Sequence, residues 1–162
     1  MPFDFRLIYA SDLEESLGRD STINFAAIVE ALRAESSSDL LISAGDNYIP
    51  GPFFNAGNDG TMRRVDGDAT LGALNIAYNA LAALEGDAPA YDSRRGAPGA
   101  IDIALMNVIG FDASAVGNHE FDAGTSSFET LLEAEQRGDE GDAGDRSAGT
   151  FFPNLTTNLD FS

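Results

Sequence analysis

The stretch DLLISAGD, Asp39–Asp46, decides the fold of this 162-residue chain. It is a short apolar run that ends in Gly-Asp, which is typical of a buried strand that runs into a loop. A run of the same kind, FRLIYA, lies at Phe5–Ala10. Between these strands, NFAAIVEALRAE at Asn24–Glu35 has apolar residues at helical spacing, and Ser21 or Thr22 is suited to cap the helix.

The alternation of strands and helices continues along the chain. A loop rich in Gly, Pro and Asn is expected at Asn47–Asp68, and an acidic, Gly-rich segment follows at Gly138–Gly149. The acidic segment is typical of a solvated loop, and a calcium loop is the alternative, although the EF-hand spacing is missing. Further helices are expected at Ala69–Gly86, Gly99–Gly110 and Ser126–Gly138, and further strands within Ala113–Asp122 and Phe151–Phe161.

The expected helices end at glycines, and Ser126 with Glu129 forms a capping-box pattern. The resulting order is β, α, β, α, α, β, α, β, without an internal repeat. Strands that alternate with helices predict an α/β fold with a mainly parallel sheet, flanked by helices on both faces.

The charge of the chain narrows the classes of partner. The formal net charge is -18, and every basic side chain is an arginine. Such a surface repels duplex nucleic acid and anionic lipid, and a phosphorylated substrate would need local cations such as bound metal ions. Adaptation to a salty medium is the alternative explanation for most of the acidic residues. The absence of cysteine excludes thiolate metal sites and disulfides, and no apolar run approaches the ~20 residues of a membrane helix.

Polar residues gather where the expected strands end. Because functional loops of parallel sheets lie at the carboxyl ends of the strands, Ser11–Glu15, Gly45–Tyr48 and Gly117–Asp122 should lie together. In the first loop, Asp12 and Glu14 are two residues apart, so in extended backbone both carboxylates would point the same way and favour a cation between them. The alternative is that they are ordinary acidic residues near the start of a helix. Taken alone, the Gly-Asp of the second loop is more typical of a turn, although the two oxygens of the Asp46 carboxylate can also bridge two metal ions.

The third loop is the most specific of the three. It reads Gly-Asn-His-Glu-Phe-Asp and contains His119, the only histidine of the chain. Asn118 offers a neutral oxygen ligand, and Asp122 is placed to hold the imidazole in one tautomer.

Together the segments YASDLE, SAGDNYIPGPFF, AVGNHEFD and FPNLTTNLDF resemble the calcineurin-like metallophosphoesterases, and within them the 5′-nucleotidase group. The resemblance covers nearly the whole chain. It implies that the sheet is the first half of an αββα sandwich, and that two divalent metal ions, Mn, Zn, Mg or Ca, are the cofactors. It also implies a phosphoester hydrolase for nucleotides or related esters and a periplasmic or extracellular location, although no signal peptide is visible at the first residues.

The resemblance carries over to individual residues. It implies a bridging role between the metals for Asp46, further ligation by Asp12 and Asn118, and phosphate contact with transition-state stabilisation by His119, partnered by Asp122. Glu14 stands where the family usually has a histidine ligand, so hard oxygen replaces nitrogen and Mn²⁺, Mg²⁺ or Ca²⁺ is favoured over Zn²⁺.

A second departure concerns the later histidines that complete the family's metal sites, since no histidine follows His119. We therefore expect residues 1–162 to form a partial metallophosphoesterase domain, without the remainder and without the nucleotidase substrate domain, and to be inactive alone. A non-catalytic cation-binding or adhesion module on the same fold is the alternative.

Overall fold

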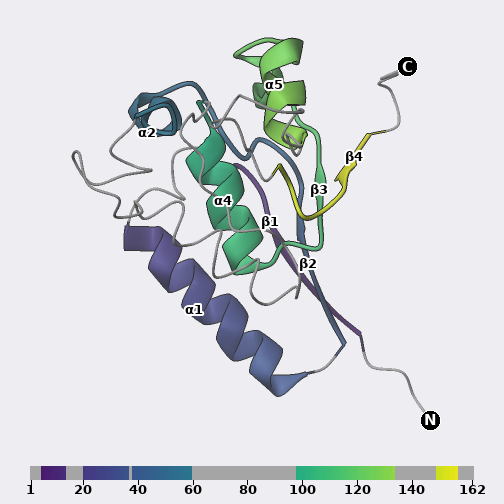
Figure 1. Ribbon diagram of the computed structural model, residues 1–162. Coiled ribbons are helices and arrows are strands. Elements are labelled where there is room, and N and C mark those ends of the chain that lie inside the picture. The colour runs from purple at the N-terminus through teal and green to yellow at the C-terminus, as the bar shows by residue number, and fades with distance from the viewer. Residues whose placement is uncertain (1–4, 14–19, 37, 60–97, 134–148, 157–162) are drawn as a thin grey trace, which may run out of the picture.

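The computed structural model describes residues 5–13, 20–36, 38–59, 98–133 and 149–156 (Figure 1). Its strands are β1 (Arg6–Ala10), β2 (Asp39–Ser43), β3 (Ala113–Ala115) and β4 (Asn154–Leu155). Its helices are α1 (Asp20–Glu35), α2 (Pro52–Ala56), α4 (Ala100–Ile109) and α5 (Thr125–Leu132), with a 3-10 turn, η3, at His119–Phe121. The strands form one sheet in the order β1-β2-β3-β4, and all neighbours are parallel. The predicted α/β class with a parallel sheet and helices is confirmed.

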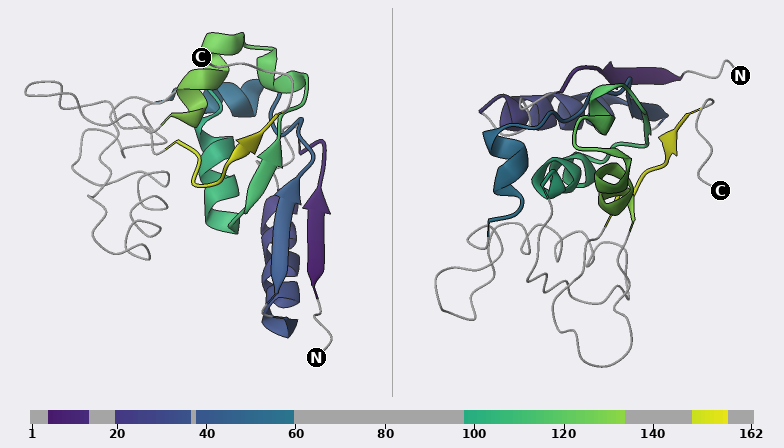
Figure 2. Two further views of the ribbon diagram at one scale, coloured as in Figure 1. Left: turned by 90° about the vertical axis from the view of Figure 1, so that its right-hand side faces the viewer. Right: turned by 90° about the horizontal axis from the view of Figure 1, so that it is seen from above.

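The main core lies between the sheet and helices α1 and α4, which cover the same face of the sheet (Figure 2). Ile8 of β1 lies in register with Leu41 of β2, and both pack into a cluster with Val29 of α1 and Met106 of α4. Leu41 is completely buried. Burial of a side chain of this size contributes about 1.5–3 kcal/mol, so this cluster fixes the register that aligns the strand ends.

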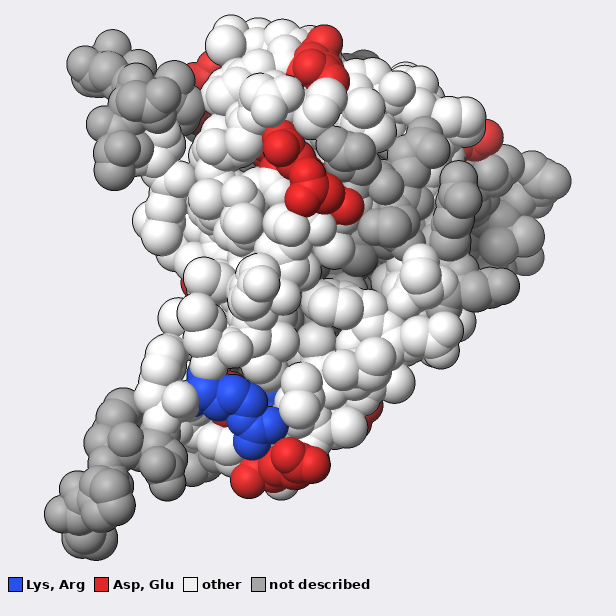
Figure 3. Space-filling view, turned by 180° about the vertical axis from the view of Figure 1, so that it is seen from behind, with Lys and Arg blue, Asp and Glu red and all other residues white. Residues whose placement is uncertain are grey.

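The opposite face of the sheet stays open in the described part of the chain. Leu7, Tyr9 and Leu155 point to this face and are 50%, 70% and 57% exposed. The left view of Figure 2 looks onto this face of the sheet. Seen from behind in Figure 3, most of the described surface is uncharged, and the acidic and basic side chains lie in a few separate places. The described structure places α1 and α4 on one face of the sheet. The prediction that helices flank both faces stays a prediction, because the helix expected at Ala69–Gly86 lies outside the described residues.

A second, smaller cluster extends the core towards the carboxyl ends of the strands. Phe54 of α2, Ile103 of α4 and Phe128 of α5 are buried in it, together with Tyr48. The loop predicted at Asn47–Asp68 thus contains an unpredicted helix, α2. Pro52 at its first turn suits a helix start, and the burial of Phe54 stabilises a segment too short to be helical alone.

Helix α4 has the bounds that its glycines predict. Gly99 precedes it and Gly110 follows it, with φ of 86° and 82°. The Gly110 N–H donates to the carbonyls of Asn107 and Met106, so the glycine closes the helix in the left-handed conformation.

Other helix ends differ from their prediction. Helix α1 begins at Asp20, so Ser21 and Thr22 lie inside the helix and do not cap it. Helix α5 begins after Gly124, whose φ of 91° and ψ of 154° suit glycine, and no side chain caps it. The predicted capping box at Ser126 is therefore wrong, and the helix ends at Leu132 because Glu133 is extended. The helix predicted at Ala69–Gly86 and the loop at Gly138–Gly149, apart from Gly149, lie outside the described residues.

Candidate functional site

The loops that follow β1, β2 and β3 meet at one edge of the sheet. The Asp12 N–H donates to the Gly45 carbonyl over 3.3 Å, which joins the first loop to the second. The His119 N–H donates to Oδ1 of Asp46 over 2.9 Å, which joins the second loop to the third. Parallel strands produce this meeting, because all their carboxyl ends lie at the same edge.

Two aspartates at this edge have an unusual backbone. Asp12 and Asp46 have φ of 53° and 52°, and they are the non-glycine residues with positive φ in the described chain. Aspartate tolerates the left-handed region better than most residues, although the conformation still costs energy. Such conformations concentrate at functional sites, where the surrounding structure holds them in place.

Gly117 allows the second and third loops to approach each other closely. A Cβ atom at Gly117 would lie 2.3 Å from Oδ1 and 2.8 Å from the backbone nitrogen of Asp46. Gly45 faces the same contact, since its Cβ would lie 2.7 Å from the Gly117 nitrogen. Glycine is therefore required at this junction for space, and at Gly45 also for its φ of 97°.

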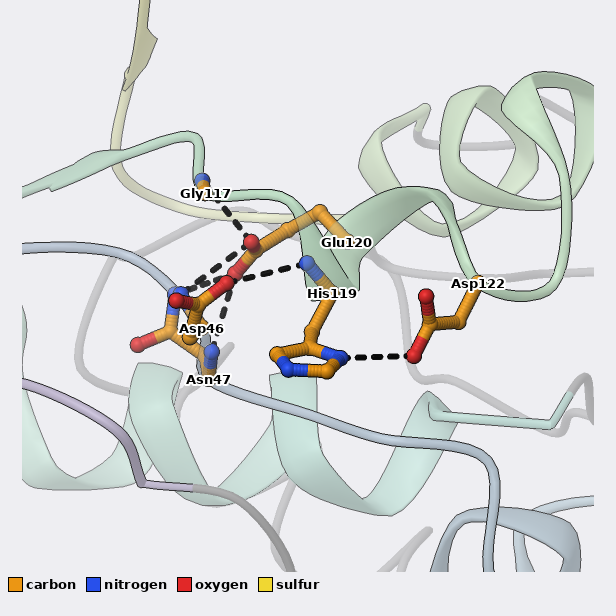
Figure 4. Close-up of polar contacts among 6 residues, drawn as sticks. All are labelled: Asp46, Asn47, Gly117, His119, Glu120 and Asp122. Carbon is orange, nitrogen blue, oxygen red and sulfur yellow. Dashed lines mark hydrogen bonds and ion pairs between the residues drawn. The ribbon is translucent and has the colours of Figure 1, made fainter.

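Glu120 is buried beneath these loops, with 3% of its surface exposed. Its Oε1 accepts hydrogen bonds from the backbone N–H and the side-chain amide of Asn47, over 2.9 and 3.0 Å. Its Oε2 accepts from the backbone N–H groups of Asp46 and Gly117, over 3.1 and 2.8 Å (Figure 4). Both oxygens are thus satisfied by N–H donors, which is how a buried carboxylate is stabilised without a cation.

Asn47 continues this network into the sheet. Its side-chain amide also donates to Oγ of Ser114 over 2.9 Å, and its Oδ1 accepts from the Ser43 hydroxyl. Asn47 is buried, so its side chain serves this internal network. Ser43 and Ser114 are buried on the core side of β2 and β3, where strands usually carry apolar residues. A serine at such a position is the sequence signal that could have indicated a buried polar network.

His119 and Asp122 form the pair that their spacing predicts. Nδ1 of His119 lies 2.7 Å from Oδ2 of Asp122, and both side chains are partly exposed (Figure 4). With Nδ1 bonded to a carboxylate, the neutral ring carries its proton on Nδ1 and leaves Nε2 as the basic nitrogen.

The structure brings together the loops that carry Asp12, Asp46, Asn118, His119 and Asp122, and it pairs the side chains of His119 and Asp122. Asp12 and Asn118 are exposed and Asp46 is half-buried, so all are accessible from solvent. Glu14, the remaining predicted ligand, lies outside the described residues. In the described part of the chain no group of at least three His, Cys, Asp or Glu side chains is arranged to hold a metal ion. Of the four predicted ligands, Asn118 is an amide and Glu14 lies outside the described residues. Only Asp12 and Asp46 therefore belong to the residue types that such a group would contain.

Tyr48 lies directly below the site with a buried hydroxyl that has no hydrogen-bond partner in the described structure. Burial, and then the negative charges of Glu120 and Asp102, raise the pKa of this hydroxyl well above its usual range. Tyr48 therefore stays neutral and acts as a packing residue, stacked on Phe54 and tilted against Phe128.

Comparison of the sequence with protein-family models and with curated proteins produced no match. None of the described helices is long and apolar enough to cross a membrane.

Proposed function

We propose that this chain is the metal-binding part of a metal-dependent phosphoester hydrolase of the calcineurin-like type, with nucleotides or related phosphate esters as substrates. The observation that supports the proposal is the meeting of three strand-end loops at one sheet edge. Hydrogen bonds from Asp12 to Gly45 and from His119 to Asp46 join these loops. The joined loops carry the carboxylates of Asp12 and Asp46, the amide of Asn118 and the imidazole–carboxylate pair of His119 and Asp122.

The donor set at this edge fits hard divalent cations. Asp12 and Asp46 offer carboxylate oxygens and Asn118 an amide oxygen, which are the ligands preferred by Mn²⁺, Mg²⁺ and Ca²⁺. Asp46 would bridge two cations, and Asp12, Glu14 and Asn118 would complete their protein ligands. Two bound cations would clamp the phosphate group and activate a water for attack on phosphorus.

His119 and Asp122 supply the remaining chemistry. The carboxylate of Asp122, 2.7 Å from Nδ1, orients the ring and favours the imidazolium form when a proton or a negative charge approaches. His119 is thereby suited to stabilise charge on phosphoryl oxygens or to protonate the leaving alcohol. The family that the sequence resembles uses additional histidine ligands, whereas His119 is the only histidine of this chain.

Titration of the chain with Mn²⁺, followed by titration with a nucleoside monophosphate, tests the proposal. We expect Mn²⁺ to bind, the nucleotide to bind only in the presence of Mn²⁺, and hydrolysis to stay below about 1 per second, the lower end of ordinary enzyme turnover. Asp46→Asn keeps the size of the side chain and tolerates positive φ, but we expect it to lose Mn²⁺. Unchanged Mn²⁺ binding in this variant would rule out the proposed site.

A cation-binding or adhesion module is the second candidate. It is favoured by the fact that His119 is the only histidine of the chain, because the family's catalytic sites use several. The same titrations separate the two functions. Mn²⁺ binding that depends on Asp46, without any Mn²⁺-dependent binding of nucleotide or inorganic phosphate, would support the module.

A further inference from the structure

Glu120 is the least accessible charged group at the strand ends, and the proposed chemistry does not use it directly. Its carboxylate is 3% exposed and reaches no cation among the described residues. It accepts instead from the backbone N–H groups of Asp46, Asn47 and Gly117 and from the Asn47 side chain. The residues on either side of it in sequence, by contrast, have side chains that solvent reaches.

These hydrogen bonds converge on the residue whose position matters most to the proposed metal site. Asp46 has a strained backbone with φ of 52°, and its N–H is fixed by Oε2 of Glu120. The next N–H along the chain, that of Asn47, is fixed by Oε1. These two N–H groups belong to the peptide units on either side of the Asp46 Cα, so one carboxylate restrains both units and with them φ and ψ of Asp46. The direction of the Asp46 Cα–Cβ bond then follows from these angles.

The same carboxylate also sets the distance between the second and third loops. Oε2 accepts from Gly117 N–H over 2.8 Å, in the loop opposite Asp46. Asn118 and His119 follow Gly117 directly, and the His119 N–H binds Asp46 Oδ1. One buried group therefore ties the Asp46 carboxylate to the segment that carries the amide ligand and the imidazole.

We propose that Glu120 is a positioning residue, which holds Asp46 in the left-handed conformation that the cation site requires and thereby sets the affinity of that site. The inference rests on the proposed function for the presence of the cation. Groups that orient metal ligands typically change metal affinity by about 10- to 100-fold when they are altered.

Glu120→Gln is the sharpest variant because it keeps the shape of the side chain. An amide has one acceptor and one donor end, so either orientation turns an NH₂ group towards two N–H donors. Asp112→Asn is the matched control. Oδ2 of Asp112 accepts from the Leu41 N–H over 2.7 Å, so the control also converts a carboxylate that binds a backbone amide, but near the amino end of β3.

The experiment combines amide hydrogen exchange in the metal-free chain with Mn²⁺ titration. In Glu120→Gln we expect the amides of Asp46, Asn47 and Gly117 to exchange about 10- to 100-fold faster, the equilibrium effect of losing one hydrogen bond to a charged group. Exchange of the Leu41 amide should be unchanged in this variant. In Asp112→Asn the remaining amide oxygen can still accept from the Leu41 N–H, so its exchange should accelerate less than that of the three amides in Glu120→Gln.

Mn²⁺ affinity should fall about 10- to 100-fold in Glu120→Gln and stay at the wild-type value in Asp112→Asn. If Glu120→Gln does not fold, Glu120→Asp is measured in the same way, because it keeps both acceptor oxygens on a shorter side chain. We expect faster exchange of the three amides and weaker Mn²⁺ binding in this variant too. Exchange at the three amides that matches the wild type, or faster exchange with unchanged Mn²⁺ affinity, overturns the positioning role alone. A wild-type chain that binds no Mn²⁺ overturns the proposed function and this inference with it.

Discussion

The contact between Gly117 and Asp46 provides a direct test of the candidate site. In Gly117→Ala the new Cβ would lie 2.3 Å from Oδ1, 2.7 Å from Cγ and 2.8 Å from the backbone nitrogen of Asp46. Rotation of the Asp46 side chain removes the first two clashes but not the third, so the backbone of one loop must move. That movement weakens the hydrogen bonds from Asp46 N–H to Glu120 and from His119 N–H to Asp46.

The magnitude follows from these two effects. An overpacked contact costs about 1–3 kcal/mol. Each hydrogen bond to a charged group contributes about 1.5–3 kcal/mol, of which partial relaxation of the loops recovers a share. We therefore expect the free energy of unfolding to fall by about 2–4 kcal/mol, out of the roughly 5–15 kcal/mol of an ordinary domain. Urea unfolding at neutral pH measures this difference.

Loss of stability alone does not identify the site, so the control is a glycine elsewhere whose replacement should lower the stability by a similar amount through a different cause. Gly124 has φ of 91°, and a Cβ added there meets nothing within 4 Å. Gly124→Ala should lose about 1–3 kcal/mol through backbone strain. We expect Gly117→Ala to weaken Mn²⁺ binding and to speed exchange of the His119 amide, and Gly124→Ala to do neither. Equal Mn²⁺ affinity in the two variants would refute the link between this contact and the site.

Two further predictions concern Tyr48 and the histidine pair. Tyr48→Phe removes a buried hydroxyl without a hydrogen-bond partner in the described structure, so we expect the stability at pH 7 to stay unchanged or to rise by about 1 kcal/mol in thermal or urea unfolding. The raised pKa of Tyr48 means that the folded state keeps its proton while the unfolded state loses it above about pH 10, so the wild type should lose stability there and the variant should lack that component. His119→Ala should keep Mn²⁺ affinity while losing Mn²⁺-dependent binding of inorganic phosphate, and Asp122→Asn should weaken phosphate binding less. Loss of Mn²⁺ from His119→Ala, measured by the same titration, would make His119 a ligand and contradict its assigned role.

The strands and the meeting of their loops follow from local patterns in the sequence. Apolar runs that end in Gly-Asp or Gly-Asn-His indicate both the strand and its functional end, and parallel pairing then brings the ends together. Helix α4 was equally predictable, because Gly99 and Gly110 mark both its ends. Helix α2 was not, since its stability comes from the packing of Phe54 against Tyr48 and Phe128, which no local pattern reveals.

The role of Glu120 shows a different limit. Its bond to the Asn47 N–H joins residues 73 positions apart, and nothing in its neighbourhood in the sequence distinguishes it from a solvated acid. Sequence reasoning assigned the neighbouring histidine and passed over the glutamate beside it. Only the close approach of the two loops turns this glutamate into a buried acceptor.

The distribution of charge in the described residues separates the two ends of the sheet. Arg6 pairs with Asp39 at the amino end of the strands, and Arg33 pairs with Asp112 just before β3. Neither arginine contacts the aspartates at the carboxyl end, Asp12 and Asp46. In a chain with a net charge of -18, the one compensating contact that the described structure gives these carboxylates is the N–H of His119 on Oδ1 of Asp46. If the proposed function holds, bound cations would offset these carboxylates, and an anionic substrate could approach them only after such cations are present.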